Sequence, residues 1–216
     1  MKKLVIFDLD GTLLNTIADL AHSTNYALNK LGYPTHEIEK YNVMVGNGID
    51  KLFERALPEE EKSKENVLRV RKEFVPYYDI HNADDSRPYP GIPELLSYLQ
   101  DAGVQIAVAS NKYQTATQKL VDHYFPEIHF TAVFGQREGV KVKPDPIIVS
   151  DILEVAKVAK EEVLYVGDSG VDMQTAANAG VTACGVTWGF RPRTELEKFN
   201  PSYIADTAGE IKKLIL

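Results

Sequence analysis

Short apolar runs rich in β-branched residues alternate along this chain with longer segments in which apolar residues recur at helical spacing. The apolar runs predict the strands of one sheet: residues 3–7, 105–109, 132–134, 163–166 and 182–186, and more weakly 203–205. Helical patterns cover 113–123, 146–156 and 173–179, and Gly180 follows the last of these where a left-handed helix end favours glycine. The alternation predicts an α/β fold, a Rossmannoid parallel sheet with helices on both faces.

About a hundred residues separate the first two predicted strands, which is far too long for one crossover loop. Helical patterns cover this interval near 36–45, 49–56 and 59–78, and no convincing strand pattern occurs there. A further helix is predicted to open at Thr16, with Asp19 three residues later as a variant of the capping box. We therefore predict an α/β core domain made of residues 1–14 and 86–216, and an inserted all-helical cap domain made of residues 15–85.

Composition narrows the classes of protein that the chain can belong to. The 216 residues carry a net charge of −7, which argues against a nucleic-acid partner and against a basic membrane-binding patch. No apolar run approaches the length of a membrane span, and the apolar run before Asp8 is too short for a signal peptide. We expect a cytoplasmic monomer or homodimer. Cys184, the only cysteine, lies in an apolar strand and is expected to be buried rather than reactive.

Polar side chains follow three of the predicted strands at the point where each strand ends: Asp8, Asp10, Ser110, Asn111, Asp168 and Asp172. Because ligands of an open parallel sheet bind beyond the carboxyl ends of its strands, these side chains are expected to converge. Lys143, in the loop before the helix at 146–156, can reach the same edge. Carboxylates this close raise each other's pKa unless a cation or a division of roles separates them. The pattern predicts an enzyme active site.

These residues fall into four motifs that resemble, in order, those of the haloacid dehalogenase (HAD) superfamily of aspartate-nucleophile phosphotransferases. The motifs are Asp8-Leu9-Asp10-Gly11-Thr12-Leu13, Ser110-Asn111-Lys112, Lys143-Pro144-Asp145-Pro146 and Gly167-Asp168-Ser169-Gly170-Val171-Asp172. The resemblance covers essentially the whole chain, and it implies an HAD-like core. Within the superfamily the chain is most similar to phosphoglycolate phosphatases, through segments at 45–48, 88–92 and 185–190. Asn15 departs from the acidic residue that many relatives carry at the start of the cap linker.

The resemblance implies a Mg²⁺-dependent phosphatase that acts on a small phosphorylated metabolite, with 2-phosphoglycolate as the first candidate. Asp8 would be the nucleophile that becomes an aspartyl phosphate, and Asp10 the general acid and base. Lys143 would place a positive charge against Asp8 and the phosphoryl group. An all-oxygen site suits Mg²⁺. Its ligands would be Asp8, the carbonyl of Asp10, and Asp168, with Asp172 in the inner or outer shell.

The phosphate oxygens would be contacted by Ser110, the backbone N–H of Asn111 and Lys143. Gly11 would let the backbone approach closely, and Thr12 would support the turn. Lys112 is interpreted as a surface residue and Trp188 as a packing residue. Gly46-Asn47-Gly48 is interpreted as either a tight turn or a substrate-facing loop, and Arg55 as either a salt-bridge partner or a substrate contact.

Other functions remain open from the sequence. A sugar-phosphate or pyrophosphate hydrolase would carry the same four motifs. A β-phosphoglucomutase-like phosphomutase would also need a cap that holds a bisphosphate, for which no pattern is visible. A non-catalytic phosphate-sensing regulator is disfavoured, because loss of activity usually erases one of Asp8, Asp10, Lys143 and Asp168, and all four are present.

Overall fold

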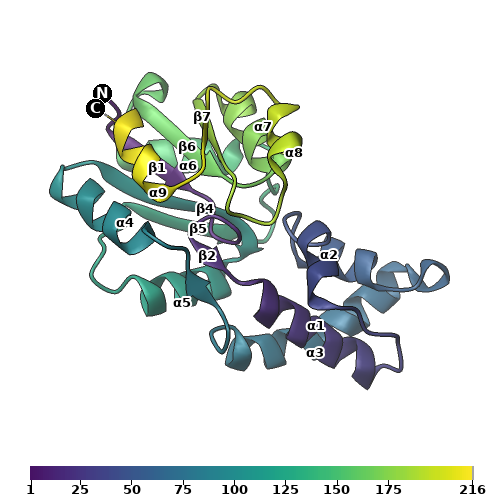
Figure 1. Ribbon diagram of the computed structural model, residues 1–216. Coiled ribbons are helices and arrows are strands. Elements are labelled where there is room, and N and C mark those ends of the chain that lie inside the picture. The colour runs from purple at the N-terminus through teal and green to yellow at the C-terminus, as the bar shows by residue number, and fades with distance from the viewer. Residues whose placement is uncertain (216) are drawn as a thin grey trace.

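One parallel sheet forms the centre of the larger part of the molecule (Figure 1). The computed structural model describes residues 1–215. Along the sheet the order is β5-β4-β1-β6-β7-β8. The strands are β1 (Leu4–Phe7), β4 (Gln105–Tyr113), β5 (Ala132–Gln136), β6 (Val163–Gly167), β7 (Thr182–Val186) and β8 (Tyr203–Ala205). All neighbouring strands are parallel, so the predicted fold class is confirmed, including the weak strand at 203–205.

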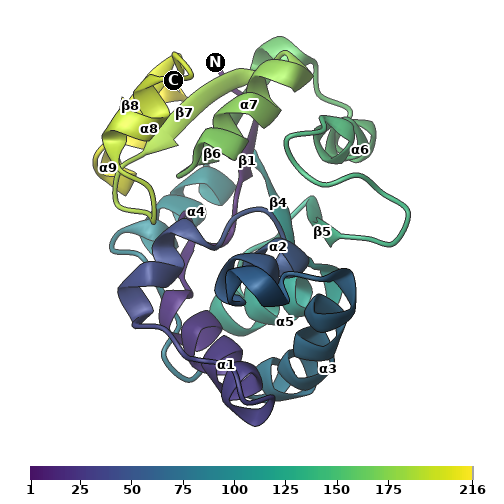
Figure 2. The same cartoon turned by 90° about the vertical axis from the view of Figure 1, so that its right-hand side faces the viewer.

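Helices cover both faces of the sheet, as predicted (Figure 2). Alternate residues of β1 point to opposite faces, because side chains of a strand alternate. Val5 and Phe7 pack in one core cluster with α4 (Ile92–Asp101), α5 (Gln114–Tyr124) and α9 (Ala208–Ile211). Leu4 and Ile6 pack in the other cluster with α6 (Ile147–Ala156), α7 (Gly170–Ala179) and α8 (Arg193–Glu197). Because β1 is buried on both faces, its carboxyl end is held firmly where Asp8 follows.

Residues 17–81 form a second group of helices beside the sheet, called the helical insertion below (Figures 1 and 2). It contains α1 (Ile17–Lys30), α2 (Ile49–Ala56) and α3 (Lys64–His81), with short 3₁₀ helices at Ile38–Val43 and Glu59–Glu61. A separate cluster of buried side chains, among them Leu28, Phe53 and Phe74, holds these helices together. The insertion joins the sheet through β2 (Leu14–Asn15) and β3 (Arg87–Pro88), which pair antiparallel.

Several local predictions in this segment are wrong. The helix predicted over 36–45 is only the six-residue 3₁₀ helix, and the one predicted over 59–78 is divided before Lys64. The two-residue strands β2 and β3 at the boundaries of the insertion were not predicted. Thr16 also makes no capping hydrogen bond, because its hydroxyl donates to Asp10 (2.6 Å). Asp19 instead accepts hydrogen bonds from Asp85 and Ser86, about 67 residues along the chain.

The two remaining 3₁₀ helices, Lys160–Glu162 and Lys212–Leu214, lie outside the insertion. Gly180 ends α7 with φ of 72°, as its position in the sequence predicted. Cys184 is fully buried in β7, and burial raises the pKa of its thiol to about 12. The thiol is therefore unreactive in the folded protein, as expected from the sequence.

Candidate active site

Asp8 and Lys143 form a buried ion pair at the carboxyl end of the sheet. The N–H of Asp8 donates to the carbonyl of Val166, which places Asp8 directly beyond β1. Lys143 Nζ lies 2.9 Å from Asp8 Oδ1 and 2.8 Å from Asp172 Oδ1, and it also donates to the carbonyl of Ala109. Burial alone would lower the pKa of Lys143, but the carboxylates of Asp172 and Asp8 outweigh it and raise this pKa well above its ordinary value. Lys143 is therefore a fixed positive charge.

Three buried carboxylates surround this lysine. Asp8, Asp168 and Asp172 each offer an oxygen, and these oxygens lie within 4.8 Å of one another. Burial, followed by the negative charge of Asp172, raises the pKa of Asp8 to about 7 and raises that of Asp168 well above its ordinary value. One lysine cannot neutralise three carboxylates. The oxygen-only cluster therefore fits a hard divalent cation, which would favour the ionised forms.

Both oxygens of Asp172 are already occupied by donors. Oδ1 accepts from Lys143 and from the hydroxyl of Tyr165 (3.2 Å), while Oδ2 accepts from the N–H (3.1 Å) and hydroxyl (2.5 Å) of Ser169. Ser169 in turn accepts from the N–H of Asp172, so the pair forms a capping box at the start of α7. Asp172 thus fixes both Lys143 and the helix that follows Asp168.

Two glycines allow the backbone to pack against Asp168. Gly11 has a φ of +86°, and a Cβ there would lie 2.3 Å from Asp168 Oδ2. A Cβ at Gly189 would lie 2.4 Å from the same oxygen, and the N–H of the next residue, Phe190, donates to it (2.7 Å). The loop after β7 therefore orients Asp168. This contact with Asp168 was not predicted from the sequence, in which residues 185–190 only resemble a family segment.

Asp10 contacts a lysine that the sequence analysis placed on the surface. Lys112 is only 4% exposed, and its Nζ lies 3.1 Å from Asp10 Oδ1, so the surface interpretation is wrong. The same Nζ donates to the hydroxyl of Tyr78 in α3 (2.8 Å). Asp10 also accepts the hydrogen bond from Thr16, the residue directly before α1 of the insertion. Asp10 is thus connected to the helical insertion, whereas Asp8 is connected to Lys143.

The candidate phosphate-binding residues lie around the same edge. Ser110 and Asn111 were expected at a strand-to-helix turn, but they lie inside β4, which continues to Tyr113 with a shift in its pairing with β5. The Asn111 side chain accepts from the N–H of Lys143 (2.8 Å) and donates to its carbonyl (3.1 Å). Asn111 therefore fixes the Lys143 loop. The hydroxyl of Thr12 is buried with no partner among the described residues.

A pocket lies between these residues and the helical insertion. The sheet side contributes Asp8, Asp10, Ser110, Asn111 and Lys112. The insertion contributes Leu20, Val45, Gly46, Gly48, Ile49 and Leu52. Gly46 and Gly48 have φ of +117° and +86°, so the segment that contains them is both a tight turn and part of the pocket wall.

The loop at residues 42–48, which forms part of the pocket wall, accepts hydrogen bonds from side chains of the insertion and from side chains of the sheet part of the molecule. Arg55 donates to the carbonyl of Met44 and to the Asn47 side chain, both at 2.7 Å, so Arg55 supports the loop from within the insertion. Arg191, from the loop after β7, donates to the carbonyls of Asn42 and Val45. Asn111 donates to the carbonyl of Gly46 (3.0 Å). Side chains of the sheet domain thus hold this pocket wall against the catalytic edge.

Comparison with known proteins agrees with this geometry. Residues 5–186 match the family model described as haloacid dehalogenase-like hydrolase. The chain belongs to the haloacid dehalogenase-like hydrolases. The match spans all four motifs and the helical insertion, so the predicted resemblance and the predicted hydrolase class are confirmed. Members of this family generally use a divalent metal, which agrees with the acidic cluster.

Several relatives to which this hydrolase is similar are named phosphoglycolate phosphatase. It is 32% identical over 218 residues to the phosphoglycolate phosphatase of Vibrio parahaemolyticus, covering 99% of this chain and 96% of that protein. A crystal structure of a candidate phosphoglycolate phosphatase from Lactobacillus delbrueckii has 34% identity and a TM-score of 0.93, covering 100% and 99% of the two chains. One from Haemophilus somnus has 29% identity and a TM-score of 0.91, covering 100% and 98%.

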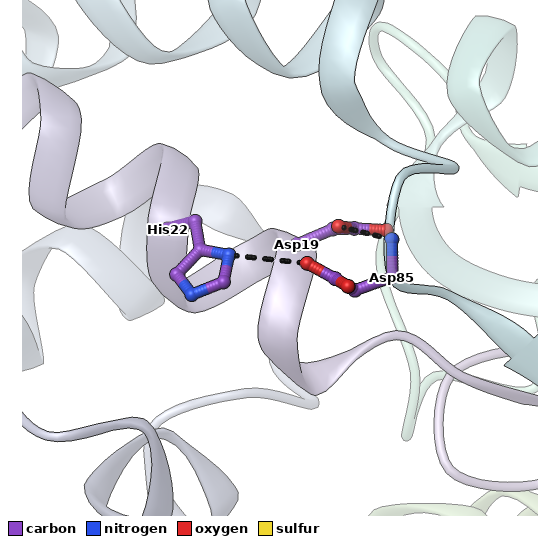
Figure 3. A group of neighbouring side chains, drawn as sticks. All are labelled: Asp19, His22 and Asp85. Carbon is purple, nitrogen blue, oxygen red and sulfur yellow. Dashed lines mark hydrogen bonds and ion pairs between the residues drawn. The ribbon is translucent and has the colours of Figure 1, made fainter.

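A second group of acidic and histidine side chains in this hydrolase lies between α1 and the segment that returns from the insertion to the sheet (Figure 3). Asp19, His22 and Asp85 lie within reach of one another. The buried carboxylate of Asp19 already accepts hydrogen bonds from the N–H groups of Asp85 and Ser86 and from the Ser86 hydroxyl. Nδ1 of His22 lies 3.5 Å from Oδ2 of Asp85. The group joins α1 to the returning segment. Among the described residues no helix is long and apolar enough to cross a membrane.

Proposed function

We propose that this hydrolase removes the phosphoryl group of 2-phosphoglycolate in a Mg²⁺-dependent reaction that passes through an aspartyl phosphate. The observation that carries the proposal is the buried arrangement of Asp8 between Lys143 and the Asp168 carboxylate, beside a pocket closed by the helical insertion. The substrate assignment is supported by relatives named phosphoglycolate phosphatase that match almost the full length of the chain.

Asp8 is the proposed nucleophile. Its Oδ1 is paired with Lys143, which leaves its other oxygen to attack phosphorus. A new oxygen–phosphorus bond forms at Asp8 as the bond from phosphorus to the leaving oxygen breaks. Lys143 stabilises the negative charge of the transferring phosphoryl group because it is a fixed cation in a buried site. When bound by Asp8, Asp168 and the Asp10 carbonyl, Mg²⁺ would supply further stabilisation of that charge.

Asp10 is the proposed general acid and base. It would donate a proton to the leaving alkoxide and then accept a proton from the water that hydrolyses the aspartyl phosphate. Its position supports this division of roles, because Asp10 contacts Lys112 and Thr16 on the pocket side, whereas Asp8 contacts Lys143. Phosphate oxygens would be bound by Ser110 and the backbone beside Gly11, with Thr12 supplying a hydroxyl that has no partner in the described protein.

We propose that Asp172 orients the residues around the metal and does not coordinate the metal directly. Its two oxygens accept four hydrogen bonds, so direct coordination would require the loss of one of them. Residues 15–85 are proposed to form the cap domain, which excludes water from the pocket and contacts the leaving group. The contacts of Arg191 and Asn111 with residues 42–46 support a closed arrangement of this cap.

The substrate assignment is tested by measuring phosphate release from a panel of phosphorylated metabolites with Mg²⁺, and again after chelation and Mg²⁺ addition. The proposal predicts that 2-phosphoglycolate has the highest kcat/KM, and that chelation abolishes turnover and Mg²⁺ restores it. A higher kcat/KM for a sugar phosphate or pyrophosphate would favour the alternative hydrolases. Isomerisation without phosphate release would favour a phosphomutase. Full turnover in thoroughly chelated protein would refute the metal dependence.

A further inference from the structure

We propose that Lys112 is a specificity-determining residue that binds the carboxylate of a short acidic leaving group. The inference rests on the proposed phosphatase function, and it names the group that distinguishes an acid such as 2-phosphoglycolate from a neutral alcohol phosphate. Three properties of Lys112 support it: its fixed position, the chemistry of the surrounding pocket, and its distance from Asp10.

Lys112 is held in place by both parts of the molecule. It lies in β4 directly after Asn111, and its side chain is only 2% exposed. The ammonium group donates to the Tyr78 hydroxyl (2.8 Å), lies 4.7 Å from the centre of the Tyr78 ring, and pairs with Asp10 (3.1 Å). An ammonium group has three N–H donors, so these two partners leave one donor for a ligand.

The remainder of the pocket wall offers an anion no other positive side chain. The insertion lines it with the apolar side chains of Leu20, Val45, Ile49 and Leu52. The sheet side adds the acidic side chains of Asp8 and Asp10 and the polar side chains of Ser110 and Asn111. Among the described residues that line the pocket, only Lys112 is cationic. A carboxylate placed against apolar side chains would lose its hydration without compensation. Beside Lys112 it would gain a charge-assisted hydrogen bond, so Lys112 is the side chain best suited to bind it.

The distance from Asp10 limits the length of the leaving group. Asp10 would contact the leaving oxygen, and in 2-phosphoglycolate a single carbon separates that oxygen from the carboxylate carbon. A carboxylate so close to the leaving oxygen lies within reach of an ammonium group that itself is 3.1 Å from Asp10. In longer acids the carboxylate would lie farther from the leaving oxygen, and therefore farther from an ammonium group that is placed beside Asp10. Lys112 thus selects for both negative charge and short length.

The test compares two substrates of similar length, 2-phosphoglycolate and the neutral 2-hydroxyethyl phosphate, in the wild type and Lys112→Met. Loss of the lysine also perturbs Asp10, but that effect reduces kcat/KM for both substrates. The readout is therefore the ratio of the two kcat/KM values, which should fall by about 10- to 100-fold, the range expected for one hydrogen bond to a charged group. Lys119→Met is the matched control, because the ammonium group of Lys119 donates to the Asp79 carbonyl on the exposed surface and does not line the pocket formed by the described residues.

If Lys112→Met does not fold, as judged by circular dichroism, Lys112→Gln provides the same comparison with a polar side chain beside Asp10. An unchanged ratio in the variant that folds, with both substrates reduced equally, would overturn the inference and leave Lys112 as a residue that only positions Asp10. Failure of the proposed function gives a different result: wild-type protein would then not hydrolyse 2-phosphoglycolate in preference to 2-hydroxyethyl phosphate.

Discussion

Ionisation of Asp8 should destabilise the folded protein when no metal is bound, and replacement of Asp8 by asparagine should remove that effect. Burial and the charge of Asp172 raise the pKa of Asp8 from 3.8 to about 7. A carboxyl group whose pKa is raised by folding stabilises the folded state fully below the unfolded pKa. That contribution is lost as the pH rises toward the folded pKa, because the unfolded chain ionises first.

The size of the effect follows from the two pKa values. Each unit of difference corresponds to about 1.4 kcal/mol, so the whole shift corresponds to about 4 kcal/mol as an upper limit. Between pH 5 and pH 8 the free energy of unfolding should therefore fall by roughly 2–3 kcal/mol through Asp8 alone. Mg²⁺ should reverse this loss, because a cation bound to the cluster favours ionised carboxylates.

The assay is urea unfolding of wild type and Asp8→Asn at several pH values, with chelator and with Mg²⁺. The difference between the two proteins reports the titration of Asp8 together with its charge interactions with Asp168 and Lys143, because groups outside the cluster are shared. In chelator, wild type should lose stability relative to the variant as the pH rises from 5 to 8. With saturating Mg²⁺, wild type should be stabilised more at pH 8 than at pH 5. A difference that does not change with pH in chelator would refute the reasoning about buried charge.

Two further predictions concern the backbone and the pocket wall. Gly11→Ala should lower the free energy of unfolding by at least about 2 kcal/mol more than Gly103→Ala does. Both glycines have positive φ, but a Cβ would collide with Asp168 only at Gly11. Equal losses of stability in urea unfolding would contradict this. Arg191→Ala should raise KM for 2-phosphoglycolate by roughly 10-fold, as expected for loss of charged hydrogen bonds to the loop at 42–45. Arg193→Ala, whose partners Glu197 and Asp206 lie outside the pocket, is the control, and an equal rise in KM there would contradict the assignment.

Much of the sheet could be predicted from sequence because its strands are buried on both faces and therefore read as short continuous apolar runs. The convergence of Asp8, Lys143 and Asp168 was predictable for a related reason. Asp8 and Asp168 each follow directly on a strand of the parallel sheet, and the carboxyl ends of parallel strands share one edge; Lys143 lies in the loop before α6, which can reach that edge.

The contacts between the insertion and the sheet could not be predicted in the same way. Asp19 resembles a capping residue of α1, but its partners Asp85 and Ser86 lie in the segment that follows the insertion. The sequence around Lys112 is compatible with a surface lysine, and only the packing of α3 brings Tyr78 beside it. Arg191 contacts carbonyl groups about 146 residues earlier in the chain. Such contacts depend on how the insertion packs, which local periodicity does not encode.

The central claim is that Asp8 becomes phosphorylated while Asp10 transfers protons. The most direct measurement is intact mass spectrometry of acid-quenched mixtures with Mg²⁺ and acetyl phosphate, followed by peptide mapping. Asp10→Asn keeps the nucleophile but loses the proton donor and acceptor, so it should accumulate a phosphoryl group on Asp8 and release it slowly. Asp8→Asn should show no adduct. A phosphoryl group mapped to Asp10, or an adduct that persists in Asp8→Asn, would contradict the account.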